Sequence, residues 1–492
     1  MMTEIKTTTT KIAWLIFAVG AFLWLVLHAV IPPKSSTSTI LIFNGGGANW
    51  AMGLGFVNAT TPDNPTLDFK PYGSYPPLYS FLFGLWSKAF GLGELQNTYF
   101  LLAIGLLRNA FMLWIALVFL SDKLQQSWVI ASAILFAVTI PYHPGPDDRA
   151  ESLSAFFFEA GLLGYALVRE KRWQHFAVGL SIGLLGITMP FGVIAGTLLY
   201  ASILYAGLKE QSIKEWLSAL GWLCIGAIIP ALPAAIYYLS HPEAFRLLIY
   251  HSTTAGGLGV AFKQAIAGNF KPIYDTIADY LTHGIFNIVT TAVGCAVTIV
   301  ALVGLLSEKR DALAISIAVA TVAIFTLTLL IAQVAYFAFN TFALAAAFFY
   351  VVAKRPACTM RTVVPAIAVL TLLTVFFVPR VARDVYARAH YAGESKKIDA
   401  VVRKIFEDHK DIRYAITGSG QYLLIRPFVP VFDAGFCDSL MRHLKQKHTV
   451  EVIYADSTDY VPEHFINKLL LRPATDIKAR RISKVGEYLL VE

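Results

Sequence analysis

The sequence has few charged residues for its length. Of its 492 residues, 15% are charged and 56% are apolar, and the mean hydropathy is +0.60. A soluble protein is typically about one quarter charged, and a soluble chain of this length would divide into two or three domains with charged surfaces. Charge this sparse excludes a soluble enzyme for most of the chain and indicates the lipid bilayer as its solvent.

Cysteine is also scarce, and the basic residues form no continuous stripe. The four cysteines are far apart and show neither CxxC nor metal-ligand spacing, so we expect no disulfide framework. The net charge is +8, but Lys and Arg lie in short clusters between long apolar runs. That placement argues against nucleic acid as a partner and is typical of the clusters that orient membrane helices.

The apolar runs predict a polytopic α-helical membrane protein. A spanning helix needs about 20 mostly apolar residues. If every basic cluster is cytoplasmic, an even number of crossings separates neighbouring clusters, so 176–208 and 312–353 must each form a hairpin. The predicted spans number about eleven: 12–32, 98–120, 127–141, 152–168, 174–189, 191–208, 217–239, 285–306, 312–331, 333–353 and 362–378.

The distribution of basic residues sets the orientation. The six segments assigned to the cytoplasm hold 13 Lys and Arg in 46 residues, whereas the outer loops 33–97, 142–151 and 240–284 hold 7 in 120. This asymmetry places the N-terminus in the cytoplasm and the C-terminus outside. We therefore expect a multi-pass protein of the cell inner membrane with a periplasmic tail.

The composition changes after Pro379, which divides the chain into a membrane domain, 1–378, and an extracytoplasmic domain, 379–492. Short apolar runs predict strands, and helices are expected near 437–447 and 462–471, so a small α/β domain fits the tail. Gly418-Ser419-Gly420 reads as a plain turn rather than a nucleotide loop. The expected strands are 412–416, 423–431, 450–454 and 487–491.

The first outer loop is rich in glycine and aromatic residues. It contains a run of three glycines after Asn44, a second glycine-rich run ending at Phe56, and an aromatic run with Tyr72, Tyr75 and Tyr79. Loops of this length are usually functional or disordered. The apolar run 78–91 is too short to span the membrane and predicts an amphipathic helix at the interface.

The second outer loop carries a dense polar cluster at the entrance of span 152–168. Acidic residues at a helix start have a structural role, because they cap exposed N–H groups and offset the helix dipole. Capping alone and capping combined with a polar site therefore both remain open. The cluster consists of His143, Asp147, Asp148, Arg149 and Glu151.

Together these stretches resemble the polytopic glycosyltransferases of the GT-C fold, which use dolichyl- or polyprenyl-phosphate sugars and include protein mannosyltransferases. The similar motifs are Ala-x-x-x-x-Gly-x-Gly-Phe at 48–56, Tyr-Pro-Pro-Leu-Tyr at 75–79 and Arg-x-Glu-Ser-Leu at 149–153. The resemblance implies sugar transfer from a lipid phosphate to an acceptor hydroxyl on the outer face.

One departure affects the catalytic base. Such enzymes usually place an acidic residue in the first outer loop just before the Gly-x-Gly run, where this chain has Asn44. The base that takes up the acceptor proton is then expected to be Asp148, with Asp147 second and Asp68 third. A degenerate, non-catalytic member remains an alternative.

Cations are needed to hold the leaving phosphate. The scarce outer-face cations Arg149, Lys70 and His251 are the candidates, although contact with lipid headgroups explains them as well. Stacking on sugar or isoprenoid could involve the aromatic run, and an interfacial aromatic belt explains it equally well. The substrate-binding candidates are Asn44, Lys70, Tyr72, Tyr75, Tyr79, His143, Arg149, Glu151 and His251.

No cofactor is expected. Asp147 and Asp148 could contribute to a Mg²⁺ or Ca²⁺ site, but two adjacent acids are not a full ligand set. Similar enzymes often work without a metal.

Two ionisable residues, Arg108 and Glu159, fall within predicted spans. Because a buried charge in a bilayer is costly unless it is paired, we expect both to face the bundle interior, near each other. They would form either a structural pair or part of the lining of a lipid-carrier cavity.

Three functions fit the sequence. The first is a GT-C-type glycosyltransferase whose partners are a lipid-linked sugar donor, membrane lipids and a glycan, lipid or protein acceptor. The second is a catalytically silent scaffold subunit of a membrane complex. The third is a transporter or flippase, which the lack of an internal repeat disfavours.

Overall fold

The structure is a computed structural model of the full chain. It describes mainly residues 2–30, 43–58, 71–120, 124–141, 149–208, 211–250, 312–331 and 337–354, together with short stretches of the tail and isolated residues elsewhere. Contacts divide the chain into two units. The first comprises residues 1–26, 102–145 and 150–384, and the second comprises residues 27–101, 146–149 and 385–492.

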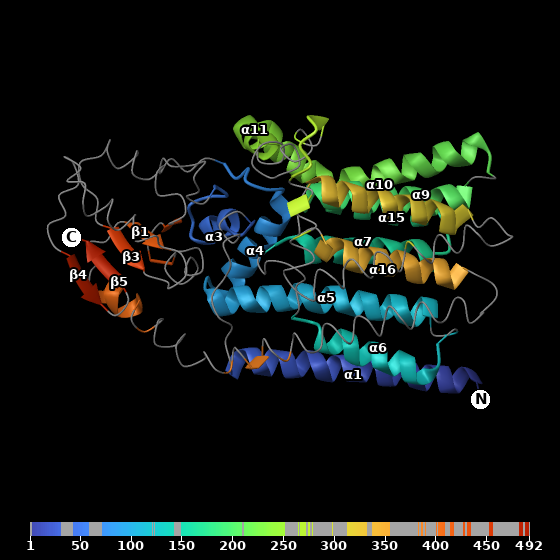
Figure 1. The fold of residues 1–492 in the computed structure, drawn as a ribbon, viewed down its shortest axis with the longest axis horizontal. Coiled ribbons are helices and arrows are strands. Elements are labelled where there is room, and N and C mark those ends of the chain that lie inside the picture. The colour runs from blue at the N-terminus through green and yellow to red at the C-terminus, as the bar shows by residue number, and fades with distance from the viewer. Residues whose placement is uncertain are drawn as a thin grey trace. The chain divides into compact units, whose positions relative to one another are not determined.

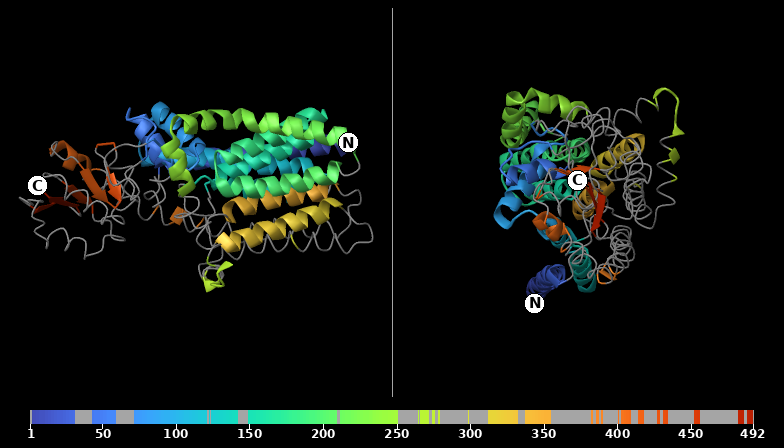
Figure 2. Two further views of the ribbon diagram at one scale, coloured as in Figure 1. Left: turned by 90° about the horizontal axis from the view of Figure 1, so that it is seen from above. Right: turned by 90° about the vertical axis from the view of Figure 1, so that its left-hand side faces the viewer.

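The first unit is helical, since a backbone that meets lipid must satisfy its N–H and C=O groups internally. Its long helices lie side by side with nearly parallel axes (Figure 1), and two further views agree (Figure 2). Helices α1 and α5 continue into the second unit. The bounds are α1 (Met2–Val30), α5 (Glu94–Leu120), α6 (Gln126–Val138), α7 (Glu151–Leu167), α8 (Lys171–Gly186), α9 (Pro190–Leu208), α10 (Ile213–Ser240), α11 (Pro242–Tyr250), α15 (Ala312–Ile331) and α16 (Phe337–Lys354).

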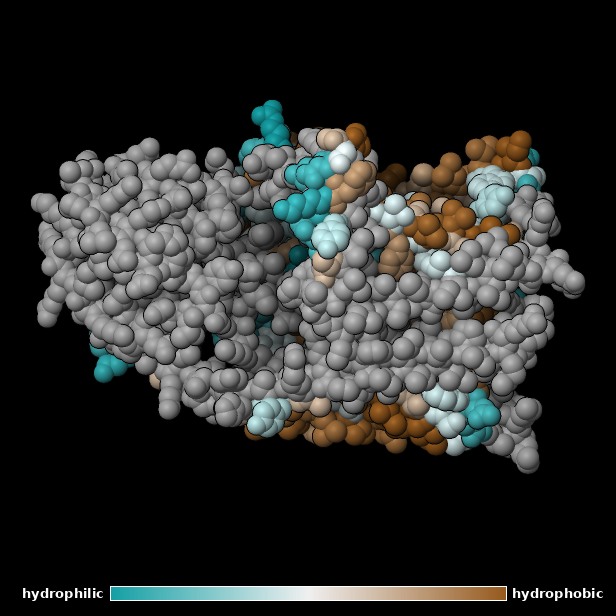
Figure 3. All heavy atoms as spheres, viewed as in Figure 1, coloured by the Kyte–Doolittle hydropathy of each residue, from teal (hydrophilic) through white to brown (hydrophobic). Residues whose placement is uncertain are grey.

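Four helices among the described residues are long and apolar enough to cross a membrane: Thr8–Val30 within α1, α5, α9 and α10. They coincide with predicted spans. Helices α1 and α10 leave much of their apolar surface exposed, for example Phe22 and Leu217, and Figure 3 shows hydrophobic surface along both. Such surface is expected where helices face lipid.

Five further predicted spans coincide with other helices of the first unit. They are α6, α7, α8, α15 and α16, which have between 13 and 20 residues. The chain breaks between α8 and α9 as expected, because Pro190 begins α9. The spans 285–306 and 362–378 lie outside the described residues, so the count of eleven stays a prediction, as does the domain boundary at 378.

Some helix ends differ from the predicted spans. Helix α1 begins at Met2, ten residues before the expected span, because the polar residues that precede the apolar run continue the helix. Helix α6 ends at Val138, before the expected end at 141. Hydropathy shows which residues can lie in lipid, whereas the backbone hydrogen bonds determine where a helix begins and ends.

Helices α8 and α10 pack through glycines. A Cβ at Gly179 would overlap the carbonyl of Leu223, one at Gly183 would overlap that of Ala227, and one at Gly226 would overlap that of Phe176. Gly179 and Gly183 form a Gly-x-x-x-Gly pair, the spacing that lets membrane helices approach closely. Van der Waals contact between the backbones therefore holds this pair together.

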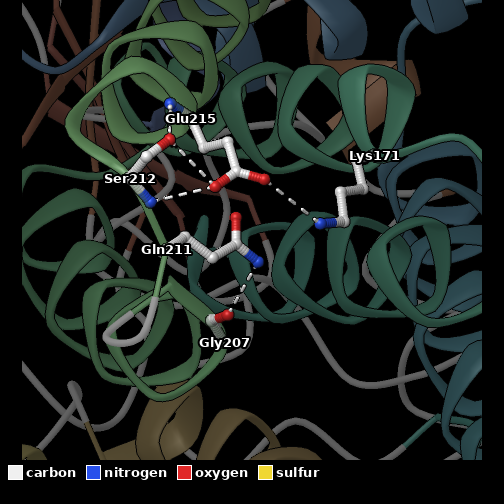
Figure 4. A network of polar contacts seen from close by, with 5 residues as sticks. All are labelled: Lys171, Gly207, Gln211, Ser212 and Glu215. Carbon is white, nitrogen blue, oxygen red and sulfur yellow. Dashed lines mark hydrogen bonds and ion pairs between the residues drawn. The ribbon is translucent and has the colours of Figure 1, made fainter.

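A capping box begins α10 (Figure 4). The Ser212 hydroxyl accepts a hydrogen bond from the backbone N–H of Glu215, and the Glu215 carboxylate accepts one from the Ser212 backbone N–H at 2.9 Å. Lys171 of α8 approaches the same carboxylate at 4.0 Å. These bonds satisfy N–H groups that a helix start would otherwise leave free.

Among the described residues, the second unit contains the short helices α3 and α4, a helical stretch at 402–408 and a mixed sheet. Helix α3 spans Gly45–Ala51 and α4 spans Pro77–Phe90, so the helix expected at 78–91 is confirmed. The sheet has the order β2-β1-β3-β5-β4. Strand β1 pairs in parallel with β2 and β3, whereas β5 pairs antiparallel with β3 and β4. The strands are β1 (Tyr414–Thr417), β2 (Val431–Asp433), β3 (Val452–Ala455), β4 (Ile482–Val485) and β5 (Tyr488–Val491).

Strands β1, β3 and β5 coincide with expected strands. The strand expected at 423–431 is wrong in extent, because residues 427–428 form a turn and β2 begins at Val431. Pro427 has no backbone N–H for a ladder, which explains the break. The helices expected near 437–447 and 462–471 lie outside the described residues, so the α/β class of the tail stays a prediction.

Candidate functional site

A cluster of aromatic rings and one cation lies in the second unit. The Phe43 ring is buried, with the rings of Tyr75 and Tyr79 at centroid distances of 4.3 Å and 6.2 Å. The Arg149 guanidinium lies 5.1 Å from the centroid of the same ring. The structure thus brings together three predicted site residues around Phe43, which sequence reasoning missed. We call Phe43, Tyr75, Tyr79 and Arg149 the aromatic–arginine cluster.

The glycines of the first outer loop serve backbone geometry. A Cβ at Gly47 would overlap the Ser80 carbonyl and lie 2.7 Å from the backbone N of Gly84, so only glycine lets α3 and α4 approach this closely. Gly53 and Gly55 have φ values of 82° and 87°, a region that side chains other than glycine rarely adopt. The run that carries the family resemblance is therefore needed to fold this segment.

Tyr72 packs within the same segment. Its ring is fully buried and lies 4.9 Å from the ring of Phe56. Gly46 lies against it, and a Cβ there would overlap the tyrosine ring. Its predicted contact with substrate stays a prediction.

Asn44 stands where similar enzymes carry an acid. Its side chain is fully buried, and its Nδ2 donates to Asn97 Oδ1 at 2.9 Å. Its Oδ1 is also buried and accepts no hydrogen bond from the described residues. An amide has no ionisable proton at neutral pH, so Asn44 cannot act as the base. Asn97 has no sequence signal, because its role depends on α5 meeting the first loop.

A second buried amide, that of Asn58, forms hydrogen bonds to residues 71–74. Asn58 Oδ1 accepts from the backbone N of Gly73 at 2.9 Å, from the backbone N of Ser74 at 3.2 Å and from Ser74 Oγ at 2.9 Å. Its Nδ2 donates to the Pro71 carbonyl at 2.9 Å. Asn58 thereby fixes the backbone that leads into Tyr75. Sequence reasoning missed this role of Asn58.

Of the remaining candidate residues, the structure describes only Glu151. Glu151 is the first residue of α7 and is buried. Asp147, Asp148, Asp68, Lys70, His143 and His251 lie outside the described residues, so their roles stay predictions. Across the described part of the chain, no three His, Cys, Asp or Glu residues lie close enough to hold a metal ion.

Arg108 and Glu159 are both fully buried in the first unit, so the prediction that they face the bundle interior is confirmed. The charge of Arg108 acts electrostatically on Glu159. Both Glu159 oxygens are buried and accept no hydrogen bond from the described residues. The Arg108 guanidinium lies 4.1 Å from the centroid of the Phe342 ring of α16.

The hydrogen bonds of Arg108 run to neighbouring helices. Its Nη1 donates to Ser152 Oγ at 2.8 Å and its Nη2 to the Thr139 carbonyl at 3.4 Å. Its Nε donates to Asn109 Oδ1 at 2.9 Å. Asn109 Nδ2 in turn donates to the Phe136 carbonyl at 2.8 Å and to Thr139 Oγ1 at 3.0 Å. These five residues form a buried polar network at the end of α6 and the start of α7.

No protein-family model and no curated protein matches the chain. Solved structures do. ArnT from Cupriavidus metallidurans, bound to undecaprenyl phosphate, superposes with a TM-score of 0.55 and 12% identity over 97% of each chain. The oligosaccharyltransferase of Archaeoglobus fulgidus, in complex with Zn and sulfate, has a TM-score of 0.48 and 13% identity, covering 89% of this chain and 68% of its own.

The likeness to ArnT shows the fold of this chain. The resemblance to the GT-C fold, stated from the motifs in the outer loops, is thereby confirmed at the level of the fold. At 12% identity, donor and acceptor do not follow from the comparison.

Proposed function

We propose that the chain is a membrane glycosyltransferase that moves a sugar from a polyprenyl-phosphate donor to an acceptor on the extracytoplasmic face of the inner membrane. The observation that carries the proposal is the fold shared over 97% of both chains with ArnT, a protein crystallised with undecaprenyl phosphate. The donor is a phosphate with a long apolar tail, so its site needs a cation beside apolar walls.

The aromatic–arginine cluster has that chemistry. Arginine holds phosphate through two parallel N–H donors, and its guanidinium is more weakly hydrated than an ammonium group. Arg149 is partly buried, and its position over the Phe43 ring limits its freedom. Tyr75 and Tyr79 supply aromatic surface beside it. We assign Arg149 to the donor phosphate and the rings to the sugar or to the first isoprenoid units.

The reaction is a displacement at the anomeric carbon. The acceptor oxygen forms the new bond to that carbon as the bond to the donor phosphate oxygen breaks, and the polyprenyl phosphate leaves with both electrons of that bond. A carboxylate takes up the acceptor proton, and cations stabilise the leaving phosphate. Asp148 is our first candidate for the carboxylate, followed by Asp147 and Asp68.

Transfer of radiolabelled sugar from a panel of undecaprenyl-phosphate monosaccharides to membrane acceptors tests the activity. We expect wild type to transfer from at least one donor, and Asp148→Asn to lower kcat at least about 100-fold, because general-base catalysis contributes roughly 10²–10⁴-fold. Unchanged activity in Asp148→Asn and Asp147→Asn would move the base to Asp68.

Binding of undecaprenyl phosphate, followed by native mass spectrometry, tests the cation. Arg149→Gln should weaken binding about tenfold or more, since a charge-assisted hydrogen bond contributes about 1.5–3 kcal/mol. Lys88→Gln is a matched control, because Lys88 also lies over a ring, 3.6 Å from the Trp50 centroid. Equal weakening by both variants would contradict a specific phosphate site at Arg149.

A catalytically silent scaffold subunit is the second candidate. The observation that favours it is the Asn44–Asn97 amide pair at the position where similar enzymes carry an acid. A silent subunit would bind undecaprenyl phosphate but transfer no sugar from any donor in the panel. It would also copurify with a partner membrane protein, so the same two assays separate the candidates.

A further inference from the structure

Helix α5 holds both ends of the connection between α6 and α7. Asn109 donates to the Phe136 carbonyl and to Thr139 Oγ1, both at the end of α6. Arg108 donates to the Thr139 carbonyl and, on the other side of the connection, to Ser152 Oγ in the first turn of α7. The bond between Arg108 Nε and Asn109 Oδ1 joins the two halves. We call Arg108 and Asn109 the α5 clamp.

The chemistry of a helix end explains why these residue types occur here. The last carbonyls of a helix have no intrahelical N–H partner, and in a membrane no lipid can replace it. The clamp supplies an amide donor to the Phe136 carbonyl in the last turn of α6 and a guanidinium donor to the Thr139 carbonyl just after it, and a positive charge near a helix C-terminus is favourable. A Cβ at Gly105 would overlap the Ile140 carbonyl, so α5 approaches the same end closely.

Helix α6 is short for a helix that crosses a membrane. With 13 residues, it is about 20 Å long at about 1.5 Å per residue, whereas the hydrocarbon core of a bilayer is about 30 Å thick. Non-helical backbone within a membrane persists only where protein groups satisfy it, and the clamp supplies such groups at the end of α6.

We propose that Arg108 and Asn109 are positioning residues of the glycosyltransferase reaction. By fixing Thr139 and Ser152, they set where the connection 140–151 leaves and re-enters the bundle. This inference rests on the proposed function, in which Asp148 or Asp147 of that connection takes up the acceptor proton. It assigns the buried arginine to orienting a catalytic segment, rather than to pairing with Glu159 alone.

Asn109→Leu tests the clamp in the full chain. Leucine branches at Cγ as asparagine does but has no polar atoms, so both donated bonds and the acceptor for Arg108 are lost. It is also larger than asparagine, and the same change at a control site accounts for the cost of that extra volume. Asn340→Leu is the matched control. Asn340 is an equally buried amide of α16 that donates to Thr328 Oγ1 at 3.0 Å. Both variants therefore lose a buried amide from the same helical unit.

Kinetics separate positioning from general stability. We expect Asn109→Leu to lower kcat about 100-fold, because misplacement of a reacting group by about 1 Å costs that much. The KM for the undecaprenyl-phosphate donor should rise as well, since Arg149, which we assign to the donor phosphate, belongs to the same connection. Asn340→Leu should keep the wild-type kcat. Wild-type kcat in Asn109→Leu, or an equal loss in both variants, would overturn the proposal.

Hydrogen exchange measured by mass spectrometry distinguishes failure of the clamp from failure of the proposed function. Asn109→Leu should speed exchange in peptides covering 136–141 and 150–154, whereas Asn340→Leu should not. If wild type transfers no sugar, the proposed function has failed, and local loosening would still support the clamp as the device that orders this connection. Unchanged exchange in Asn109→Leu would overturn the clamp itself.

Discussion

Replacing Asn58 by alanine is expected to open the backbone that leads into Tyr75. In the wild type, Asn58 Oδ1 is the shared acceptor for three donors of Gly73 and Ser74, and its Nδ2 reaches the Pro71 carbonyl. The truncation removes all four bonds and leaves buried donors without an acceptor. The first outer loop therefore depends on one amide.

The magnitude follows from the number of bonds. A hydrogen bond contributes about 1 kcal/mol net, and an orphaned buried donor costs about 1–3 kcal/mol. Asn340→Ala removes a side chain of the same size and burial, but only one hydrogen bond to another side chain is assigned to it. Asn58 makes three more hydrogen bonds than Asn340, so the free energy of local opening should fall by about 3 kcal/mol more in Asn58→Ala than in Asn340→Ala.

Hydrogen exchange in a peptide covering 71–76 is the appropriate assay, because it reports opening locally. A loss of about 3 kcal/mol corresponds to exchange about 100-fold faster, at about 1.4 kcal/mol per factor of ten. Asn340→Ala should leave this peptide unchanged. An increase below about threefold in Asn58→Ala would refute the reasoning, since it would show that water or rearranged backbone replaces the amide at little cost.

Three further outcomes are expected from thermal unfolding in detergent, followed by tryptophan fluorescence. Gly47→Ala should destabilise the chain by about 1–3 kcal/mol or more through overlap with backbone, whereas Gly221→Ala, which has open space around its Cβ, should be neutral or slightly stabilising. Tyr200→Phe should cost about 1–3 kcal/mol, because its hydroxyl donates to the Phe158 carbonyl at 2.7 Å, and no change would contradict this. The Ser212 backbone N–H and hydroxyl hold the pKa of Glu215 below its ordinary value of 4.5. The ionised carboxylate therefore stabilises the folded state above pH 4.5, and this stabilisation is lost as the pH falls through the lowered pKa. Glu215→Gln should therefore show a smaller loss of stability on acidification than wild type.

Hydropathy and charge predicted the helical membrane unit well, because both depend on whether a segment is surrounded by lipid or by water. The predicted spans 98–120, 191–208 and 217–239 all fall within apolar helices. Helix ends were less predictable, since α6 ends where side chains of α5 satisfy its carbonyls. Strand β4 was missed because Ile-Ser-Lys-Val is not an apolar run. It lies at the edge of the sheet, where polar residues are tolerated.

The candidate site was predictable only where a residue type stands out from its surroundings. Arg108 and Glu159 are ionisable residues in apolar runs, so their inward orientation followed from the cost of exposing charge to lipid. Asn58, Asn97 and Asn109 carry no such signal, because an amide gains its role from the backbone that tertiary packing brings to it. The partners of Asn97 and Asn109 depend on how α5 packs against Asn44 and against the end of α6, and those of Asn58 depend on the path of residues 71–74.

The glycines between α8 and α10 limit how this sequence can diverge. At Gly179, Gly183 and Gly226, even one added methyl group would meet a carbonyl of the facing helix. The outward side of α10 requires only that its residues remain apolar. Among descendants of this chain, that outward side should therefore exchange Ile, Leu, Val and Phe freely, while the three glycines should change only together with compensating shifts of both helices.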